Sequence, residues 1–303
     1  MSFKKVTLKG EVPSGRSQFG MCSAGGVTYI FGGQRGNEAY NDMYSISHTD
    51  WTCTKIQPKG TIPSSRWKCT LTAVDDKLYL FGGETVGAIK TNELHVFDIR
   101  VGQMARSGHT CTLIKNELVI YGNDGDSNEN PLNALSILSL ENMEWRQPSQ
   151  GGSVPEVRSG HSAITFNGKL IMYGGYGHNT RTALDEVWVY DLGAARWIEI
   201  PKRGPRPEPR SGSQAWVSTK YFCVWGGIGP GRQHDWTDLH YADITSSPLT
   251  WQKKKPMGVV SPPERYSHGV SIVDDQTVLI FGGQKDAKTF FEDAFTLSTS
   301  NVY

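Results

Sequence analysis

Apolar and polar residues alternate along most of this chain in short runs, and no stretch keeps the spacing of an amphipathic helix. Such alternation predicts β-strands that bury one face. Six of the runs end in an aromatic residue followed by two small residues: YIFGG, YLFGG, VIYGN, IMYGG, CVWGG and LIFGG. Because the pattern returns, the chain is predicted to consist of repeats.

Other residues recur in step with this glycine pair. The pairs end at residues 33, 83, 123, 175, 227 and 283, with spacings of 50, 40, 52, 52 and 56. Asn123 replaces the second glycine once, and asparagine is the next-best residue for a positive φ. An alternating run follows each pair, and a tryptophan follows four of these runs, at Trp51, Trp145, Trp197 and Trp251. An arginine opens each unit: Arg16, Arg66, Arg106, Arg158, Arg210 and Arg265.

Each unit therefore predicts four short strands, which we call a (after the arginine), b (ending at the glycine pair), c (the alternating run) and d (with the tryptophan). Pro-rich turns join strand d to the next strand a. Six such units bury their faces best by radial packing. The prediction is an all-β, six-bladed β-propeller of four-stranded antiparallel blades. It forms a single domain over residues 1–303, with units starting near residues 16, 66, 106, 158, 210 and 265.

The glycine pair, the aromatic residue in strand c and the spaced tryptophan together resemble the kelch repeat. The resemblance covers essentially the whole chain. It implies a kelch propeller, a fold whose members include protein receptors.

The two ends of the chain predict how the ring closes. Phe3 lies 13 residues before Arg16, and Trp197 lies 13 before Arg210. Residues 3–8 are therefore predicted to supply strand d of the last blade, whose other strands come from the C-terminus.

Blade 2 is predicted to be three-stranded. Only 23 residues separate its glycine pair from the next arginine, against 33 to 38 in the other units, and its tryptophan is missing. Residues 94–98 are then expected to form an exposed edge that could pair with a second copy of the chain.

Composition narrows the function classes. A net charge of +1 gives no footprint for nucleic acid or an anionic membrane surface. The five cysteines form no CxxC pair, and the N-terminus has no apolar leader segment. Both features favour a reducing compartment, the cytoplasm, with the nucleus equally compatible.

The arginines are the best functional candidates, because each is expected near the mouth of the central channel. Guanidinium groups suit carboxylates. In kelch receptors, arginine and serine at matching positions bind acidic or C-terminal peptide segments, and the resemblance implies the same here. Trp67, Tyr266 and Trp236 add aromatic anchors on the same face. The predicted partner-binding set is Arg16, Ser17, Arg66, Trp67, Arg106, Ser107, Arg158, Ser159, Arg210, Ser211, Trp236, Arg265 and Tyr266. The alternative is that the repeated arginine is a framework residue.

The sequence favours a protein-interaction module, scaffold or receptor over an enzyme, and it calls for no cofactor. One alternative is a binder or enzyme for a sugar-acid-like molecule at the channel mouth, with Glu84 and Asp124 as the acids to test. Another is an assembly unit that pairs through blade 2. A metal site is disfavoured, since the position of His109, His161 and His268 holds Phe19, Cys69 and Ser213 in the other units. The loop NDGDSNEN begins like a calcium loop but lacks its glycine and its final glutamate.

Overall fold

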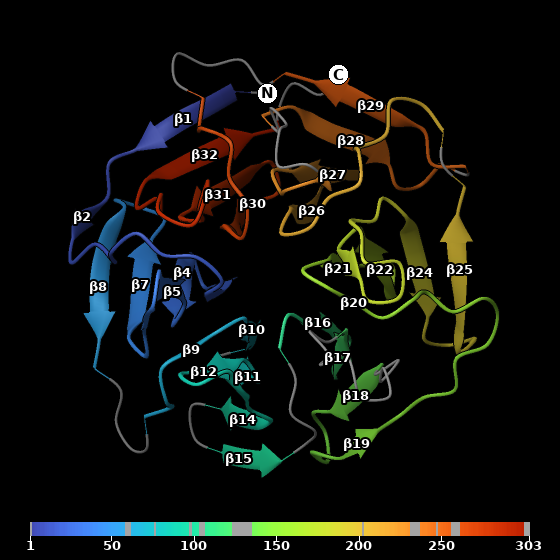
Figure 1. Cartoon of the computed structure of the whole chain (residues 1–303), viewed down its shortest axis with the longest axis horizontal. Helices are drawn as coiled ribbons and strands as arrows, with labels where there is room; N and C mark the ends of the chain where they lie inside the picture. Colours follow the sequence, from blue (N-terminus) through green and yellow to red (C-terminus); the bar gives the residue numbers. More distant parts are fainter. Residues whose placement is uncertain are drawn as a thin grey trace. The chain divides into compact units, whose positions relative to one another are not determined.

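The computed structural model describes residues 2–57, 62–75, 77–96, 107–122, 135–201, 203–230, 237–246, 248–255 and 261–299, and the backbone of 99–102. Its regular structure there consists of β-strands (Figure 1). The described residues contain no helix long and apolar enough to cross a membrane. The chain divides into two compact units, Met1–Ala105 with Lys255–Tyr303, and Arg106–Lys254.

Unit 1 contains three main sheets, which we name after their strand a. The β30 sheet contains β30 (Gly269–Asp274), β31 (Thr277–Phe281), β32 (Ala294–Ser298) and β1 (Ser2–Val6). The β3 sheet contains β3 (Gly20–Ala24), β4 (Val27–Phe31), β7 (Met43–Ser47), β8 (Thr52–Ile56) and β2 (Lys9–Gly10). The β10 sheet contains β10 (Thr70–Val74), β11 (Lys77–Phe81), β14 (Glu93–Val96) and β15 (Ile99–Gly102).

Unit 2 repeats this plan. The β16 sheet contains β16 (Thr110–Ile114), β17 (Glu117–Tyr121), β18 (Ser136–Ser139) and β19 (Trp145–Arg146). The β21 sheet contains β21 (Ser162–Phe166), β22 (Lys169–Tyr173), β24 (Val187–Asp191) and β25 (Arg196–Ile200). The β26 sheet contains β26 (Gln214–Ser218), β27 (Tyr221–Trp225), β28 (Leu239–Asp243) and β29 (Trp251–Lys254).

Short strands beside the glycine pairs complete the description. They are β5 (Gln34–Arg35), β6 (Glu38–Ala39), β9 (Arg66–Trp67), β12 (Glu84–Thr85), β13 (Ile89–Lys90), β20 (Arg158–Ser159) and β23 (Tyr176–Gly177). Strands β9, β12 and β13 form a three-stranded sheet, and the others pair in twos.

The hydrophobic core of each unit lies between neighbouring sheets. In unit 1, Ile30 and Ile46 of the β3 sheet pack with Leu279 and Phe281 of the β30 sheet. In unit 2, Trp188 and Trp197 of the β21 sheet pack with residues of the β16 sheet. The alternating runs in the sequence are therefore strands whose inward side chains meet the next sheet.

The N-terminal strand joins the sheet of the C-terminal strands, as the sequence predicted for residues 3–8. Strand β1 pairs antiparallel with β32, and Phe3 lies opposite Leu297. In the β21 sheet Trp197 lies opposite Tyr190 in the corresponding place. Phe3 thus takes the position that tryptophan takes elsewhere.

Two predictions about strand d were wrong. The β10 sheet has four strands and not three, because β15 pairs with β14 and brings Val101 opposite Leu94. Strand β15 consists of residues that the tryptophan pattern does not mark. In the β3 sheet Cys53 lies opposite Ile46, so Cys53 and not Trp51 takes the tryptophan position. Trp51 lies in the preceding turn with a positive φ of 61°.

Candidate functional site

The repeated arginines form the internal frame of the sheets. The side chains of the five that the structure describes are at most 1% exposed, and they are Arg16, Arg66, Arg158, Arg210 and Arg265. Arg106 lies outside the described residues. In Arg158, Nε donates to the carbonyl oxygen of Glu156 at 3.1 Å and Nη1 donates to that of Gly174 at 3.0 Å. The other four make the corresponding two bonds.

Within each compact unit, a glycine pair links the arginines of consecutive repeats. The carbonyl of Gly174 accepts from Arg158, while the N–H of Gly175 donates to the carbonyl of Arg210 at 2.9 Å. A Cβ on Gly174 would lie 2.8 Å from that carbonyl oxygen, which is too close for any other residue. The recurring glycine is therefore required by this close approach, and φ is also positive there.

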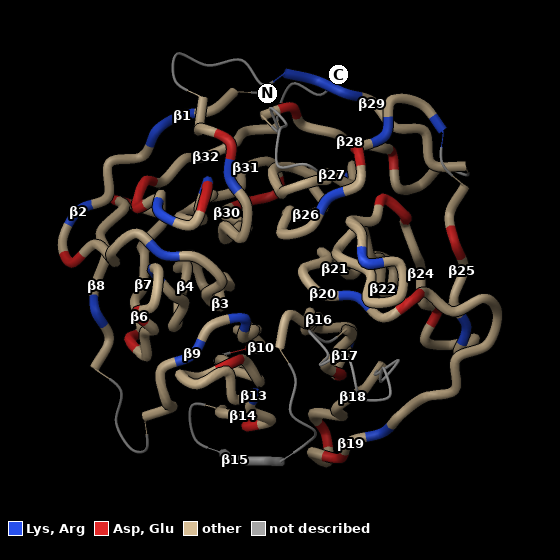
Figure 2. The backbone as a smooth tube through the Cα atoms, in the orientation of Figure 1, with Lys and Arg blue, Asp and Glu red and all other residues tan. Residues whose placement is uncertain are grey.

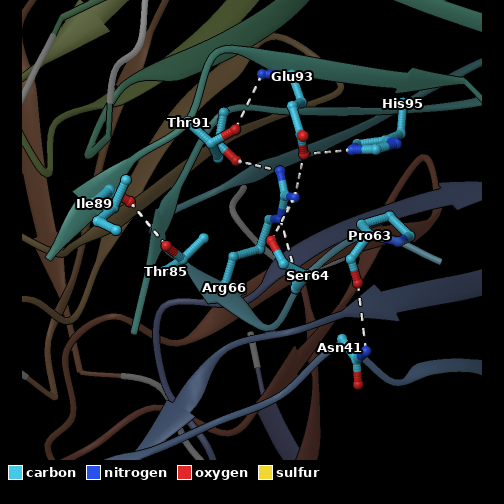
Figure 3. Close-up of polar contacts among 10 residues, drawn as sticks. Asn41, Pro63, Ser64, Arg66, Thr85, Ile89, Thr91, Glu93 and His95 are labelled. Atoms are coloured by element: carbon cyan, nitrogen blue, oxygen red, sulfur yellow. Dashed lines mark hydrogen bonds and ion pairs between the residues drawn. The ribbon is translucent and has the colours of Figure 1, made fainter. Parts of the chain in front are cut away.

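Each described arginine also has a carboxylate partner. Arg16 pairs with Asp42, Arg66 with Glu93, Arg158 with Glu186 and Arg265 with Asp293, at N–O distances of 2.5 to 2.7 Å. Arg210 pairs with Glu208 at 2.9 Å. Hydrogen bonds from Arg66 and His95 lower the pKa of Glu93 to about 2 (Figure 3). These guanidiniums are already neutralised inside the chain, so the framework alternative describes the five better than a partner-binding ring does.

The residue directly after each described arginine has a recurring backbone partner. It pairs with the residue after the glycine pair, and we call these two residues a display pair. The display pairs are Ser17 with Gln34, Trp67 with Glu84, Ser159 with Tyr176, Ser211 with Ile228, and Tyr266 with Gln284. Trp67, Ser159, Ser211 and Tyr266 are half-buried, whereas Ser17 and Ser107 are buried. Trp236 lies outside the described residues.

The display pairs of unit 1 carry a polar network. Ser17 donates to Oε1 of Gln284 at 2.5 Å, and Gln284 donates to the Tyr266 hydroxyl at 2.6 Å. Lys68 pairs with Glu84 at 3.2 Å. Sequence reasoning missed Gln34 and Gln284, although their register directly after the glycine pair marks them.

A second set of backbone bonds ties neighbouring repeats together beside the display pairs. Two residues after the repeated arginine, φ is positive in every repeat, as at Gln18 and Gly160. The Lys68 N–H donates to the Gln18 carbonyl at 2.7 Å in unit 1, and the Gly212 N–H donates to the Gly160 carbonyl at 2.8 Å in unit 2. The display pairs therefore stand on a rigid hydrogen-bonded base.

The β26 sheet departs from the common ion pairing. Asp238 pairs with Lys253 at 2.7 Å, and Glu208 takes its place beside Arg210. His240, two residues after Asp238, is buried, and neither of its ring nitrogens has a hydrogen-bond partner among the residues that the structure describes. Burial lowers its pKa to about 4, and the nearby Arg210 acts in the same direction.

The three repeated histidines are buried at equivalent places. Burial and the nearby arginine lower the pKa of His161 and of His268 to about 3, so both are neutral near pH 7. His161 packs edge-on against Tyr121 and contacts Thr110 at 2.8 Å. Across the described part of the chain, no three His, Cys, Asp or Glu residues are arranged to hold a metal ion. The calcium-like loop lies outside the described residues.

The structure describes one of the two acids considered for catalysis, together with several cysteine thiols. Glu84 is bound to Lys68, and Asp124 lies outside the described residues. Burial raises the pKa of Cys22 to about 12 and those of Cys53 and Cys69 to about 11. These thiols are protonated near neutral pH and are poor nucleophiles. Figure 2 shows acidic and basic residues interspersed along both units.

Comparison with known proteins identifies the family. The model of the KLHDC2/KLHL20/DRC7 Kelch-repeats domain matches residues 1–107 and 108–302. Similar proteins include acyl-CoA-binding domain-containing protein 5 of Arabidopsis thaliana, 26% identical over 90% of this chain and 45% of its own length. Human kelch domain-containing protein 3 is 24% identical over 79% of this chain and 57% of its own length. Adagio-like protein 1 of Oryza sativa subsp. japonica is 29% identical over 65% of this chain and 31% of its own length. The chain thus spans about half or less of these relatives' lengths, and its repeats place it in the kelch-repeat family.

Proposed function

We propose that this chain is a protein-interaction domain that binds a segment of another protein over its display pairs. Kelch-repeat proteins generally mediate protein–protein interactions. The relatives are longer than this chain, so the proposal concerns the repeat domain itself.

One observation carries the proposal: a constant frame presents variable residues. The buried arginine and its bonds recur in every described repeat. The display pairs instead combine hydroxyl, amide, carboxylate and aromatic groups differently in each repeat. A rigid base with varied side chains suits the recognition of one particular partner surface.

The chemistry of the display pairs bears on the expected partner. An acidic or C-terminal segment was predicted from the arginines, but the five described guanidiniums already have carboxylate partners. A carboxylate would instead have to be held by hydroxyl and amide donors such as Ser159, Ser211 and Gln284. We propose that the part of the ligand that contacts the display pairs is a short polar segment, with its acidity to be measured.

The proposal also includes the architecture that presents these pairs. We infer that the six main sheets are the blades of one six-bladed propeller that folds as a single domain over residues 1–303. Two observations support this inference. The same frame around a buried arginine recurs in the repeats, and strand β1 from the N-terminus completes the sheet of the C-terminal strands. Scanning calorimetry is expected to give one unfolding transition, and two separated transitions would contradict the single domain.

Affinity capture followed by peptide titration tests the function. Wild type is compared with Trp67→Ala/Tyr266→Ala, which removes two half-buried display residues. The control is Lys77→Ala/Ile272→Ala, which alters exposed residues of β11 and β30 outside the display pairs. Overlapping peptides from each captured protein are then titrated, in acidic and amidated forms.

The proposal expects one peptide that binds wild type and the control equally and the display variant at least about tenfold more weakly. Equal binding by all three proteins would reject the display pairs as the site. Equal affinity of the acidic and amidated forms would reject recognition of a carboxylate.

A further inference from the structure

One hairpin in unit 1 presents an uncharged apolar tip. Strands β12 and β13 are joined by Val86, Gly87 and Ala88, and Val86 and Ile89 are 68% and 64% exposed. They are the two most exposed large hydrophobic side chains among the described residues. A pair of aliphatic side chains standing in solvent side by side is unfavourable unless something covers it.

The corresponding hairpins elsewhere are polar. After the glycine pair, the β3 sheet has Arg35 and Glu38, and the β30 sheet has Lys285 and Asp286. The loop of the β21 sheet contains Arg181. Residues 85–89 are Thr-Val-Gly-Ala-Ile and contain no charge. The apolar tip is therefore particular to one repeat and is not a requirement of the fold.

The hairpin holds its tip rigidly. Thr85 lies opposite Ile89, the Thr85 hydroxyl donates to the Ile89 carbonyl at 3.2 Å (Figure 3), and the Ala88 N–H donates to the Thr85 carbonyl at 3.1 Å. Ala88 is kept at φ 60°, a conformation that residues other than glycine seldom adopt. A preformed tip loses little conformational entropy when a partner covers it.

The base of the hairpin joins the tip to the proposed binding face. It also determines which charged groups lie near the tip. Glu84 lies opposite both Lys90 and the display residue Trp67. Two nearby ion pairs are closed, Lys68 with Glu84 at 3.2 Å and Arg66 with Glu93 at 2.6 Å. A charged partner surface would gain no ion pair from these groups and would lose its own hydration. An uncharged aliphatic surface is the electrostatic complement.

From these observations we infer that Val86 and Ile89 form a second anchor for the same partner, and that the partner presents an uncharged, aliphatic segment to it. The inference rests on the proposed function, because the tip continues the face that carries Trp67. Aliphatic side chains on a fixed turn, next to a half-buried aromatic ring, have the features of an interface hot spot.

A selected peptide tests the inference. A phage-displayed random 12-residue library is selected on wild type, and the consensus peptide is titrated by fluorescence anisotropy. The test variant is Val86→Thr/Ile89→Thr, which keeps β-branched side chains on the hairpin. The control, Ile272→Thr, makes the same change at a 52% exposed site on β30. Thermal melting confirms that all three proteins are folded.

The inference expects a consensus rich in aliphatic residues, about tenfold weaker binding to the Val86/Ile89 variant, and unchanged binding to Ile272→Thr. Unchanged binding to the Val86/Ile89 variant with loss in Trp67→Ala/Tyr266→Ala would overturn the inference and leave the proposed function standing. A consensus of charged residues would also overturn it. A library that yields no ligand for wild type counts against both proposals.

Two further measurements test whether a second copy of the chain or a membrane surface covers the tip instead. Sedimentation that shows a dimer of wild type, lost in Val86→Thr/Ile89→Thr, would assign the tip to a second copy and overturn the inference. Tip-dependent binding to phosphatidylcholine vesicles would assign it to a membrane surface and overturn it as well. Monomeric protein without vesicle binding supports the protein partner.

Discussion

At the scale of single residues, the repeated arginine shows how one side chain can hold a sheet to its neighbour. Its guanidinium binds two carbonyls of its own repeat and a carboxylate, with the planar fork satisfied in several directions at once. Its own carbonyl accepts from the glycine pair of the preceding repeat, as Arg210 does from Gly175. Removing the side chain should leave a carboxylate and a carbonyl without their partner.

Arg158→Ala is therefore expected to lower the free energy of unfolding by about 3–5 kcal/mol, the typical effect of breaking a buried ion pair. Urea unfolding followed by fluorescence measures the change. Arg146→Ala is the matched control in the same unit, because Arg146 is 48% exposed and its pair with Glu117 lies at the surface. A loss of less than about 1 kcal/mol in both variants would refute the framework role.

This geometry explains why the sequence alone left two roles open for the arginines, a partner-binding surface and a buried framework. An arginine before a strand suits a binding surface and a buried frame equally, since composition does not give the direction of a side chain. The missing signal was a carboxylate 26 to 28 residues later, at the start of strand c, as in Asp42, Glu93, Glu186 and Asp293. Counting from the arginine to that acid would have predicted the ion pairs.

His240→Phe is expected to raise the free energy of unfolding by about 1–2 kcal/mol, because both ring nitrogens are buried and have no hydrogen-bond partner in the described part of the chain. Other repeats already carry Tyr44, Trp188 or Phe295 at this place. His95→Phe is the control, since His95 occupies the same place and contacts Glu93 at 2.8 Å. That change should be neutral or destabilising. Stabilisation of both variants, or of neither, in urea unfolding would contradict the explanation.

Buried histidines also predict a dependence on pH. Folding lowers the pKa of His161 and His268 to about 3 and that of His240 to about 4, against an ordinary value of 6.5. Below pH 6.5 the unfolded chain binds protons that the folded chain excludes, so the free energy of unfolding falls as pH falls from 6.5 toward these values. Each histidine should lower it by about 2 kcal/mol between pH 7 and pH 5.

Urea unfolding of wild type and His240→Phe at pH 7 and pH 5 checks this dependence. The variant lacks one of the titrating groups, so its loss between the two pH values should be smaller by about 2 kcal/mol. Equal losses in the two proteins would show that His240 is not neutral and buried in the folded state.

At the scale of elements, the loss of a linker glycine after strand d explains why the segment between the β10 sheet and Arg106 is short. Gly10, Gly152 and Gly204 each lie seven residues after the tryptophan position and have φ between 75° and 80°. Each lies against strand d of the next sheet, as Gly204 does on the Trp251 carbonyl. In the β10 sheet, residues 99–102 form strand β15, and only three residues precede Arg106. The shortening therefore removes this linker glycine and keeps the strand.

The sequence predicts the strands that carry a recurring pattern, and it does not predict a strand that lacks one. The strands with a glycine pair or an alternating run were placed correctly, because those patterns follow from close backbone approach and from burial of one face. Strand β15 has neither mark, and its place is known only from its pairing with β14. The proposal of self-association through residues 94–98 loses its premise, since β15 pairs with that strand.

Gly204→Ala is expected to destabilise the protein by more than Gly26→Ala. Both glycines have φ of 76°, so both changes carry the same backbone strain of about 1–2 kcal/mol. A Cβ on Gly204 would lie 2.4 Å from the Trp251 carbonyl oxygen, whereas a Cβ on Gly26 has nothing within 4 Å. Urea unfolding of the two variants isolates the packing of the linker. Equal losses would show that this contact does not constrain the chain.

At the scale of the whole molecule, the two ends of the chain share one sheet. Strand β1 pairs along its full length with β32, from Ser2 opposite Ser298 to Val6 opposite Ala294. Unit 1 consequently joins residues 1–105 with residues 255–303. The closing strand could be predicted because Phe3 keeps the 13-residue spacing to the arginine. The partner segment could not, because recognition depends on residues that vary between repeats.

Removing residues 1–10 should destabilise unit 1 sharply, because it deletes β1 and β2 and exposes the outer edge of β32. Phe3→Ala tests the same closure by one side chain. Phe3 is buried and packs edge-on against Phe295 with ring centroids 6.4 Å apart, so its loss should cost about 3–5 kcal/mol. Lys4→Ala, on the exposed face of the same strand, should change the free energy of unfolding by less than about 0.5 kcal/mol. Melting temperatures that are equal for wild type, the truncated chain and Phe3→Ala would mean that β1 does not close the fold, and the last sheet would then have to be stable with three strands.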